Sequence, residues 1–326
     1  MRLENENLID TSSQLSASDE QVVCTLFEGH YHLGLAALVN SMIKSGFSGL
    51  LWAGYRGALP PWTAQLTAIG PEFYALPNGA RLKFERLESG VHFANYKPDW
   101  MLQLIATGVA TRLLWYFDPD ITVRCSWKFY ERWAGFGVSI CSDITNGSMP
   151  PRHPLRCIWS ELAEEAGWGT PVVPQTRYFN SGFLGLPVEL VSFLERWRKA
   201  ISLAGNYGTS LNSFMPGSRE DAFYATDQDA LNLTAMYATE PISAIGPEGM
   251  GFVPGGFTMY HSVGSPKPWR KPFLRSALNA VPPSNGDKHF LANVDGPIHP
   301  YSPAELKRMR QVAALASVIG RFYRRA

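Results

Sequence analysis

The sequence predicts an α/β protein in which a mostly parallel sheet is flanked by helices. Short apolar runs rich in β-branched and aromatic residues alternate with longer segments of helical spacing, and Gly and Pro stand at the junctions. Such alternation is typical of parallel sheets covered by helices. With 326 residues, 45% of them hydrophobic, the chain is long enough to bury a large core.

The first half of the chain supplies four predicted strands. "VVCTLF" at 22–27 is the first, and a helix follows Tyr31 because apolar residues recur there at helical spacing. The next elements are the strand "GLLWAG", a short Pro-initiated helix "PPWTAQLTAIG", the strand "RLKFERL", a helix from Pro98 to Ala110 and the strand "RLLWYF".

The pattern continues through the second half without an internal repeat. The predicted elements are a helix from Trp127 to Trp133, the strand "GVSIC", the helix "RCIWSELAEEAG", the strand "RYFNSGFLGL", the helices "VELVSFLERWRKA" and "TDQDALNLTAMY", a loop from Pro241 to Gly256, and a C-terminal helix beginning "PAELKRMRQ". We expect a flexible leader at 1–20, a catalytic domain at 21–275, and a loop with a basic helical tail at 276–326.

Composition excludes several classes of protein. The polar, acidic first twenty residues have no apolar core of a secretory signal, and no stretch approaches the roughly 18 apolar residues of a membrane span. A formal net charge of +1 gives no global attraction to nucleic acid. Four scattered cysteines without CxxC spacing predict reduced, mostly buried thiols in a cytoplasmic protein.

The strand "RLLWYF" is followed by two carboxylates one residue apart, Asp118 and Asp120. In extended backbone these side chains point the same way, so both can face one point. Two adjacent carboxylates repel and lose hydration when buried, and Mg²⁺ or Mn²⁺ would remove that repulsion. A simple turn is the alternative, because Asp and Pro both favour turns.

"YHSVGSPKPW", from Tyr260 to Trp269, supplies complementary groups. His261 offers a metal-ligand nitrogen, Gly264 permits close backbone approach and Lys267 offers a cation for phosphate. An exposed loop with one histidine is the alternative. The sequence has neither GxGxxG after the first strand nor GxxxxGK[ST], so dehydrogenases and P-loop enzymes are disfavoured.

Four elements in order, "YFDPDI", "YFNSGFL", "DQDALN" and "HSVGSPKPW", resemble the retaining glycosyltransferases of family 8, which include glycogenin and bacterial lipopolysaccharide galactosyltransferases. The resemblance spans roughly residues 21 to 272. It implies a GT-A fold with a Rossmann-like sheet, and a nucleotide-sugar donor, commonly a UDP-sugar, bound with Mn²⁺ (or Mg²⁺). It matches Asp118, Asp120 and His261 to metal ligands, and Gly264 and Lys267 to donor-phosphate contacts.

The same resemblance assigns residues around the sugar. Lys97 resembles a donor-site lysine, with a solvated lysine at a helix start as the alternative. Asn180 and Ser181 resemble residues that line the sugar pocket. The alternative is a strand bulge permitted by the glycine that follows them. Asp143 resembles a carboxylate that faces donor sugar or acceptor, but is equally a helix N-cap or turn residue.

The segment "TDQDALN" resembles the stretch beside the anomeric carbon. Asp227, Gln228 and Asp229 are its matching residues, whereas helix capping and an acidic first turn explain them without catalysis. The chain also departs from the family. Relatives typically have Asn or Asp shortly before the position of Tyr31. The resemblance still assigns Tyr31 to stacking on or bonding the nucleoside, but uridine selection is in doubt. Tyr224 stands where many relatives have Asp, so acceptor contacts are expected to differ.

The resemblance implies a metal-dependent hexosyltransferase of the EC 2.4 type that moves a hexose to a hydroxyl of a saccharide or glycolipid, in surface polysaccharide or lipopolysaccharide synthesis. The alternatives are a sugar nucleotidyltransferase and an inactive carbohydrate-binding protein. Retention by same-face attack needs no protein nucleophile, whereas double displacement would use Asp229 or Gln228.

The C-terminal segment is the one strongly basic stretch. It suggests peripheral contact with anionic lipid at the inner face of the plasma membrane, with an ordinary solvated helix as the alternative. Its basic residues are Lys307, Arg308, Arg310, Arg321, Arg324 and Arg325.

Overall fold

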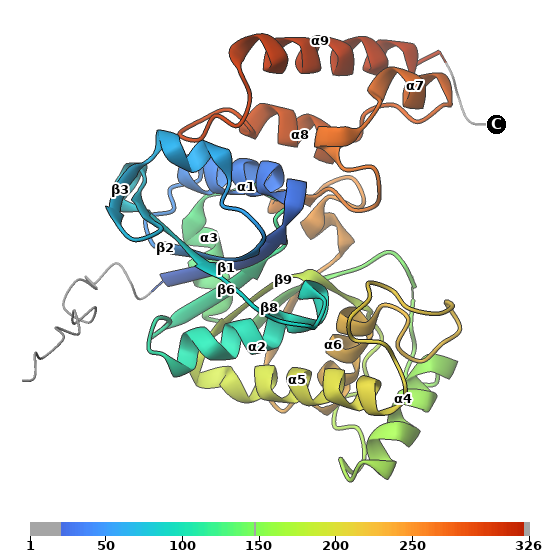
Figure 1. The fold of residues 1–326 in the computed structure, drawn as a ribbon. Coiled ribbons are helices and arrows are strands. Elements are labelled where there is room, and N and C mark those ends of the chain that lie inside the picture. The colour runs from blue at the N-terminus through green and yellow to red at the C-terminus, as the bar shows by residue number, and fades with distance from the viewer. Residues whose placement is uncertain (1–20, 147, 323–326) are drawn as a thin grey trace, which may run out of the picture.

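The structure, a computed structural model, describes residues 21–146 and 148–322. The expected leader at 1–20 and the basic residues Arg324 and Arg325 lie outside these ranges. Within the described part, the chain forms a twisted central sheet with helices on both faces and a further helical layer above it (Figure 1).

The central sheet has nine strands in the order β10-β8-β9-β6-β1-β2-β5-β4-β3 across the described residues. Seven of them point the same way, because only β4 and β9 run antiparallel to their neighbours. The predicted mostly parallel sheet is therefore confirmed. The strands are β1 Gln21–Glu28, β2 Leu50–Arg56, β3 Thr67–Gly70, β4 Phe73–Ala75, β5 Arg81–Arg86, β6 Leu113–Phe117, β8 Val138–Ser142, β9 Phe179–Pro187 and β10 Ile242–Ile245.

Helices cover both faces of this sheet. On one face α2, α4, α5 and α6 enclose an apolar cluster that includes Trp100, Trp159 and Trp197; on the other, α1 and α3 enclose a second cluster around Phe117 and Trp127 (Figure 1). The bounds are α1 His32–Lys44, α2 Phe93–Ala106, α3 Trp127–Ala134, α4 Pro154–Glu165, α5 Val191–Asn206 and α6 Thr226–Tyr237.

The last helices form the layer at the top of Figure 1, next to α1. A third apolar cluster holds them together, in which Trp269, Phe273, Phe290 and Leu306 are buried. These helices are α7 Phe273–Leu278, α8 Asn285–Asn293 and α9 Pro303–Ile319. This layer is the expected C-terminal helical extension.

Three element predictions need correction. "PPWTAQLTAIG" is helical only over a short 3-10 turn, Pro61–Gln65, and then becomes β3, which pairs with β4. The segment from Pro241 to Gly256 contains β10, which lies parallel to β8. Helix α2 spans Phe93–Ala106 instead of the predicted Pro98 to Ala110. It begins ahead of Pro98 because the side chain of His92 caps it through the Ala94 N–H.

The cysteine prediction is also only partly right. Cys24 and Cys141 are buried, Cys125 is partly buried and Cys157 is exposed, all as free thiols. Among the described residues, no helix has the length and apolar character needed to cross a bilayer.

Candidate active site

A two-stranded ribbon beside the main sheet brings the two predicted metal motifs together. Strand β6 ends at Phe117, and Asp118 to Asp120 turn the chain into β7 (Ile121–Val123). Strand β7 pairs antiparallel with β11 (Met259–His261), in a register that sets His261 opposite Ile121. Residues distant in the sequence therefore become neighbours through backbone pairing.

Asp118, Asp120 and His261 form a group able to hold a metal ion, because their ligand atoms lie within 4.8 Å of one another. His261 Nε2 lies 3.2 Å from Asp120 Oδ1 and 3.6 Å from Asp118 Oδ2. Two carboxylates and one imidazole suit Mn²⁺ or Mg²⁺. Gly182 keeps the space open: a Cβ there would come within 2.5 Å of His261 Cε1 and 2.8 Å of Asp118 Oδ2.

Lys267 compensates the charge of Asp120. Its Nζ lies 2.5 Å from Asp120 Oδ2 and also donates to the Ser262 carbonyl at 3.0 Å. Burial opposes ionisation of Asp120, but His261 and Lys267 outweigh it and hold the pKa of this carboxyl well below its usual range. The repulsion between the two carboxylates is thus balanced by cations placed by the second motif.

Lys97 compensates the charge of Asp118, the other carboxylate of the pair. It is buried within α2, so it is not the solvated lysine of a helix start. Its Nζ lies 2.8 Å from Asp227 Oδ2, 3.2 Å from Asp118 Oδ1 and 3.2 Å from the Ser181 carbonyl. Burial lowers the pKa of Lys97, but the two carboxylates outweigh it and raise it, so Lys97 stays charged.

A hydrogen-bonded network extends from Lys97 along the start of β9. Asn180 Nδ2 donates to Asp143 Oδ2 at 2.5 Å and to Gln228 Oε1 at 3.1 Å, and the Ser181 hydroxyl donates to Asp227 Oδ2 at 2.6 Å. Asp143 also closes a turn, because its Oδ1 accepts the N–H of the residue two positions on at 2.6 Å. The turn alternative and the site assignment for Asp143 are therefore compatible.

Asp229 lies apart from this network. Its carboxylate accepts the Tyr178 hydroxyl at 2.6 Å and the Ala225 N–H at 2.8 Å, and its burial raises its pKa to about 7. Ala225, and neither Thr226 nor Asp227, occupies the N-cap position of α6. The capping explanation for Asp227 is therefore wrong, although its carboxylate does sit in the first turn.

Tyr31 stands next to the lysine of the second motif. Lys267 Nζ lies 5.8 Å from the centre of the Tyr31 ring, and Trp269 meets that ring edge-on at 5.5 Å. Gly34 makes this packing possible, because a Cβ there would lie 2.4 Å from the Pro119 carbonyl and 2.7 Å from the Trp269 ring. Gly264 adopts φ +82° with open space around it, as a turn glycine does.

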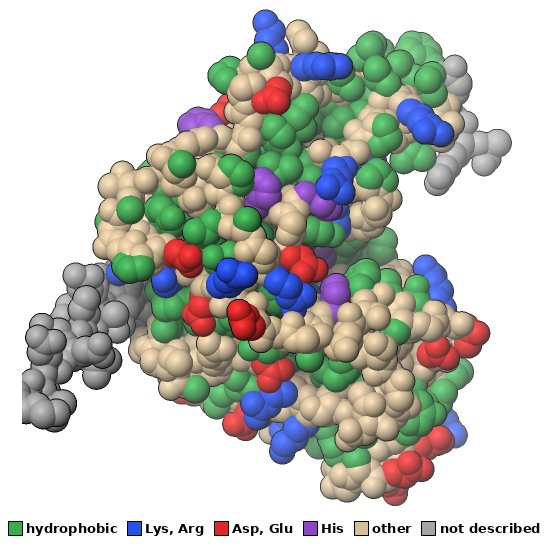
Figure 2. Space-filling view, viewed as in Figure 1, with side chains coloured by type: hydrophobic (Ala, Val, Ile, Leu, Met, Phe, Trp, Pro, Cys, Tyr) green, Lys and Arg blue, Asp and Glu red, His purple; other side chains and the backbone are tan. Residues whose placement is uncertain are grey.

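The charged groups lie on one face of the molecule. Figure 2 shows acidic, basic and histidine side chains gathered beside a hollow between the C-terminal helical layer and the side of the molecule that carries α4 and α6. The hollow lies where the carboxyl ends of the parallel strands meet, which is the usual ligand position in such sheets.

Three contributors to this site were not predicted from the sequence. Tyr116 donates its hydroxyl to Asp118 Oδ1 at 2.9 Å, Gly182 leaves room for the metal group, and Tyr178 holds Asp229. The position of Tyr116, two residues before Asp118 on a strand, was a signal, because such residues share a face. The other two lie in the motif "YFNSGFL", but their residue types do not indicate these roles.

Comparison with solved structures identifies the fold of this chain. No protein-family model matches the chain, and none of the curated proteins matches it by sequence. Among solved structures, the galactosyltransferase LgtC in complex with donor and acceptor sugar analogues is similar, with 14% identity, a TM-score of 0.51 and coverage of 88% of this chain and 99% of LgtC. An active-site mutant of LgtC matches at 13% identity with the same TM-score and coverage. At these identities the likeness establishes architecture, and the chain has the GT-A fold of these glycosyltransferases.

Proposed function

We propose that this protein is a metal-dependent retaining glycosyltransferase, which moves a hexose from a nucleotide-diphospho-sugar to a hydroxyl of a saccharide or glycolipid. A UDP-sugar is the donor that we expect first. The observation that carries the proposal is the convergence of Asp118, Asp120 and His261 with Lys267 and Lys97 on a GT-A sheet. LgtC, which shares the fold, was crystallised with donor and acceptor sugar analogues.

The donor set fits a divalent ion. Asp118, Asp120 and His261 would hold Mn²⁺ or Mg²⁺, and such an ion supplies Lewis-acid stabilisation to the negative charge that develops on a departing diphosphate. Lys267 is the residue placed to add a second positive charge, because two hydrogen bonds already orient its ammonium group. Gly264 leaves the backbone beside it unobstructed for a phosphate.

Lys97 has a positioning task in this proposal. Because it is buried and shared by Asp118 and Asp227, it fixes both carboxylates against each other. Asp227 accepts a hydrogen bond from the Ser181 hydroxyl, and Asn180 donates to Asp143 and Gln228. These hydrogen-bonded residues form one rigid polar wall. We assign the hexose to this wall, whose amide and carboxylate groups suit sugar hydroxyls.

The geometry supports same-face attack over double displacement. Asp229 is a poor nucleophile, because it is only 4% exposed and both of its oxygens already accept hydrogen bonds. Gln228 Oε1 is also engaged, by Asn180 and by the Ser181 N–H. With same-face attack, the departing phosphate takes the proton of the acceptor hydroxyl and no protein nucleophile is needed.

The acceptor and cellular setting are part of the same proposal. We assign the enzyme to surface polysaccharide or lipopolysaccharide synthesis in the cytoplasm, with α9 resting on anionic lipid at the inner leaflet. Exposed Lys307, Arg308 and Arg321 support that contact, whereas Arg310 is engaged internally through the Leu291 carbonyl. Reversing Lys307 and Arg308 to Glu should abolish binding to phosphatidylglycerol vesicles, and unchanged vesicle binding would contradict the membrane assignment.

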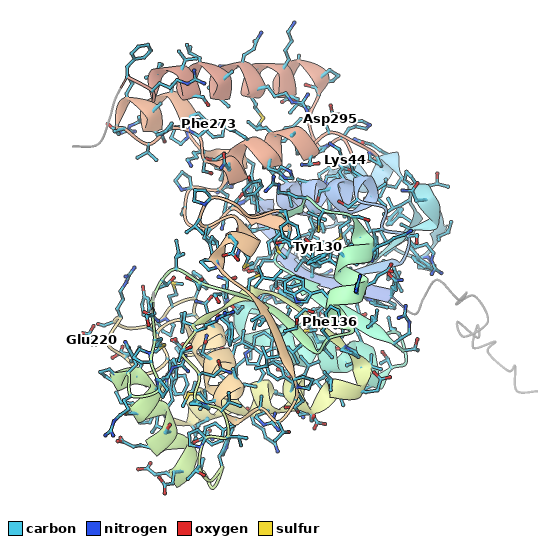
Figure 3. All side chains as sticks on the ribbon, turned by 180° about the vertical axis from the view of Figure 1, so that it is seen from behind. Lys44, Tyr130, Phe136, Glu220, Phe273 and Asp295 are labelled. Carbon is cyan, nitrogen blue, oxygen red and sulfur yellow. The ribbon has the colours of Figure 1, made fainter. Side chains whose placement is uncertain are left out.

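The experiment that tests the proposal measures nucleotide release from a panel of nucleotide-sugars with Mn²⁺ or with EDTA. The protein, Asp120→Ala and Asp295→Ala are compared, since Asp295 is an exposed carboxylate of the C-terminal layer (Figure 3). We expect release from one donor, dependent on Mn²⁺, lost in Asp120→Ala and kept in Asp295→Ala.

Other results would point to the alternatives. Pyrophosphate release from a nucleoside triphosphate and a sugar 1-phosphate would indicate a nucleotidyltransferase. Calorimetry could instead show metal-dependent binding of a donor that releases no nucleotide, either by itself or in the presence of an acceptor panel. That result would indicate a carbohydrate-binding protein. Absence of any metal-dependent donor binding would contradict the metal assignment of Asp118, Asp120 and His261.

A further inference from the structure

A second polar cavity lies at the other end of the ribbon that carries the metal group. It has a volume of about 300 Å³, and its polar lining residues are Lys44, Ser45, Arg124, Ser126, His289 and Asn293. Strand β7 separates it from Asp120, and three residues of strand span about 10 Å. Its lining shares no residue with the metal group, so it is a separate site.

The charge of this cavity is one-sided. Its lining includes two cations, Lys44 and Arg124, and no carboxylate. Lys44, at the end of α1 close to α8 (Figure 3), makes no hydrogen bond or ion pair with any residue in the described ranges. Arg124 is held in place, because its Nη1 donates to the Gly256 carbonyl and its guanidinium stacks 4.5 Å from the centre of the Tyr260 ring.

The neutral groups around these cations place no negative charge in the cavity, and one of them adds a hydrogen-bond donor. His289 stays uncharged at neutral pH, because burial, Arg124 and Lys44 together lower its pKa to about 4. Ser126 is the N-cap residue of α3 and its hydroxyl makes no capping bond, so it is available as a donor beside the positive end of that helix. Asn293 also lines the cavity but adds no free donor, because its Nδ2 lies 2.8 Å from the His289 carbonyl and 3.1 Å from His289 Nδ1.

We propose that this cavity binds a phosphoryl group, through Lys44 and Arg124 with Ser126 beside them. Guanidinium and ammonium groups are the standard partners of phosphate oxygens, and no carboxylate in the lining competes for them. The volume lies at the lower end of the range for ligand pockets, about 300–1,000 Å³, which fits a phosphate or a small phosphomonoester. The polar lining excludes a purely apolar ligand.

Binding of inorganic phosphate, followed by calorimetry in EDTA at constant ionic strength with chloride as the reference anion, tests this proposal. We expect saturable binding that weakens about tenfold or more in Lys44→Ala and further in Lys44→Ala/Arg124→Gln. The matched control is Lys128→Ala/Arg132→Gln, which removes the same charges from exposed positions of α3 outside the cavity. Equal affinity in Lys44→Ala and the control, or no binding beyond that of chloride, would overturn the proposal.

Two further arms identify the source of the phosphoryl group and exclude the proposed donor site. Lys267→Ala, which removes the cation beside Asp120 and leaves the cavity lining intact, should bind phosphate as the unchanged protein does. Loss of binding there would move the phosphate to the proposed donor site and overturn the proposal. Phosphatidylglycerol vesicles replace phosphate in a parallel titration. Vesicle binding that requires Lys44, with weak binding of free phosphate, would assign the cavity to a lipid headgroup.

Discussion

Tyr116 fixes one carboxylate of the metal group, because its buried hydroxyl donates to Asp118 Oδ1 at 2.9 Å. Groups that hydrogen-bond metal ligands are commonly worth tenfold or more in metal affinity. Tyr116→Phe should therefore weaken Mn²⁺ binding about tenfold, measured by calorimetry. Tyr130→Phe is the matched control, since Tyr130 is equally buried and donates to the Thr258 carbonyl instead. Equal Mn²⁺ affinity in the two variants would contradict the role of Tyr116.

Asp229 makes stability depend on pH. Because its folded pKa of about 7 lies above its ordinary value, the stability that it contributes is complete below about pH 4 and is lost as the pH rises through 7. The free energy of unfolding relative to Asp229→Asn should fall by at most about 1.4 kcal/mol per pH unit between these limits. Urea unfolding from pH 4 to 8 measures it. Parallel stability curves for the two proteins would show that Asp229 does not titrate.

Much of the site could be predicted from residues alone, because the residue types of an acidic pair, a histidine and a lysine themselves indicate metal and phosphate binding. The space in front of Asp118 could not. It depends on Gly182, and a strand glycine has many explanations until His261, from another strand, is placed 2.5 Å from its absent Cβ. The ligand residues of a site can be recognised in the local sequence, whereas the empty space between them depends on tertiary contacts.

At the scale of elements, α1 and the loop that carries Lys267 meet at Gly34. Helix propensity alone predicts that Gly34→Ala stabilises α1 by about 1 kcal/mol. The Cβ would instead lie 2.4 Å from the Pro119 carbonyl and press on Trp269, so we expect the free energy of unfolding to fall by about 1–3 kcal/mol and Mn²⁺ affinity to fall with it. Gly90→Ala, in open space, should leave both unchanged in urea unfolding and calorimetry. A stabilised Gly34→Ala would contradict this packing.

Long periodic elements were predictable and short ones were not. The predicted helix at 226–237 coincides with α6, Thr226–Tyr237, a twelve-residue segment that contains neither Gly nor Pro. Strand β10, Ile242–Ile245, has four residues between Pro and Gly and reads as loop. It becomes a strand through pairing with β8, which begins at Val138. This pairing cannot be predicted from the residues of the segment itself.

At the scale of the whole molecule, the direction of β9 decides where Asn180 and Ser181, part of the proposed sugar-binding wall, lie. The rule that ligands bind at carboxyl ends of parallel strands would look for partners at the end of β9. Strand β9 runs antiparallel between β6 and β8, so its beginning meets the end of β6, and the N–H of Asp118 bonds the Gly182 carbonyl at 2.7 Å. This places Asn180 and Ser181 beside Asp118. Strand direction within an α/β sheet is a property of the assembled core, which the sequence pattern does not reveal.

Metal binding should stabilise the whole fold, because the proposed ligands come from β11 and from the turn between β6 and β7. An ion that binds only the folded state adds about 2.7 kcal/mol at a concentration one hundred times its Kd. For a chain of this size that corresponds to a rise in Tm of about 4 °C. We expect Mn²⁺ to raise Tm by this amount in the protein and in Gly90→Ala, and EDTA to reverse it.

The variants decide whether that rise comes from this site. In Asp120→Ala a ligand is missing, and in Gly182→Ala the added methyl group occupies the space between His261 and Asp118, so Mn²⁺ should raise Tm in neither. The comparison uses only the shift caused by Mn²⁺, because each substitution also changes the starting stability. A full Mn²⁺ shift in Gly182→Ala would mean that the ion binds elsewhere, since that variant keeps all three ligands and loses only the room between them.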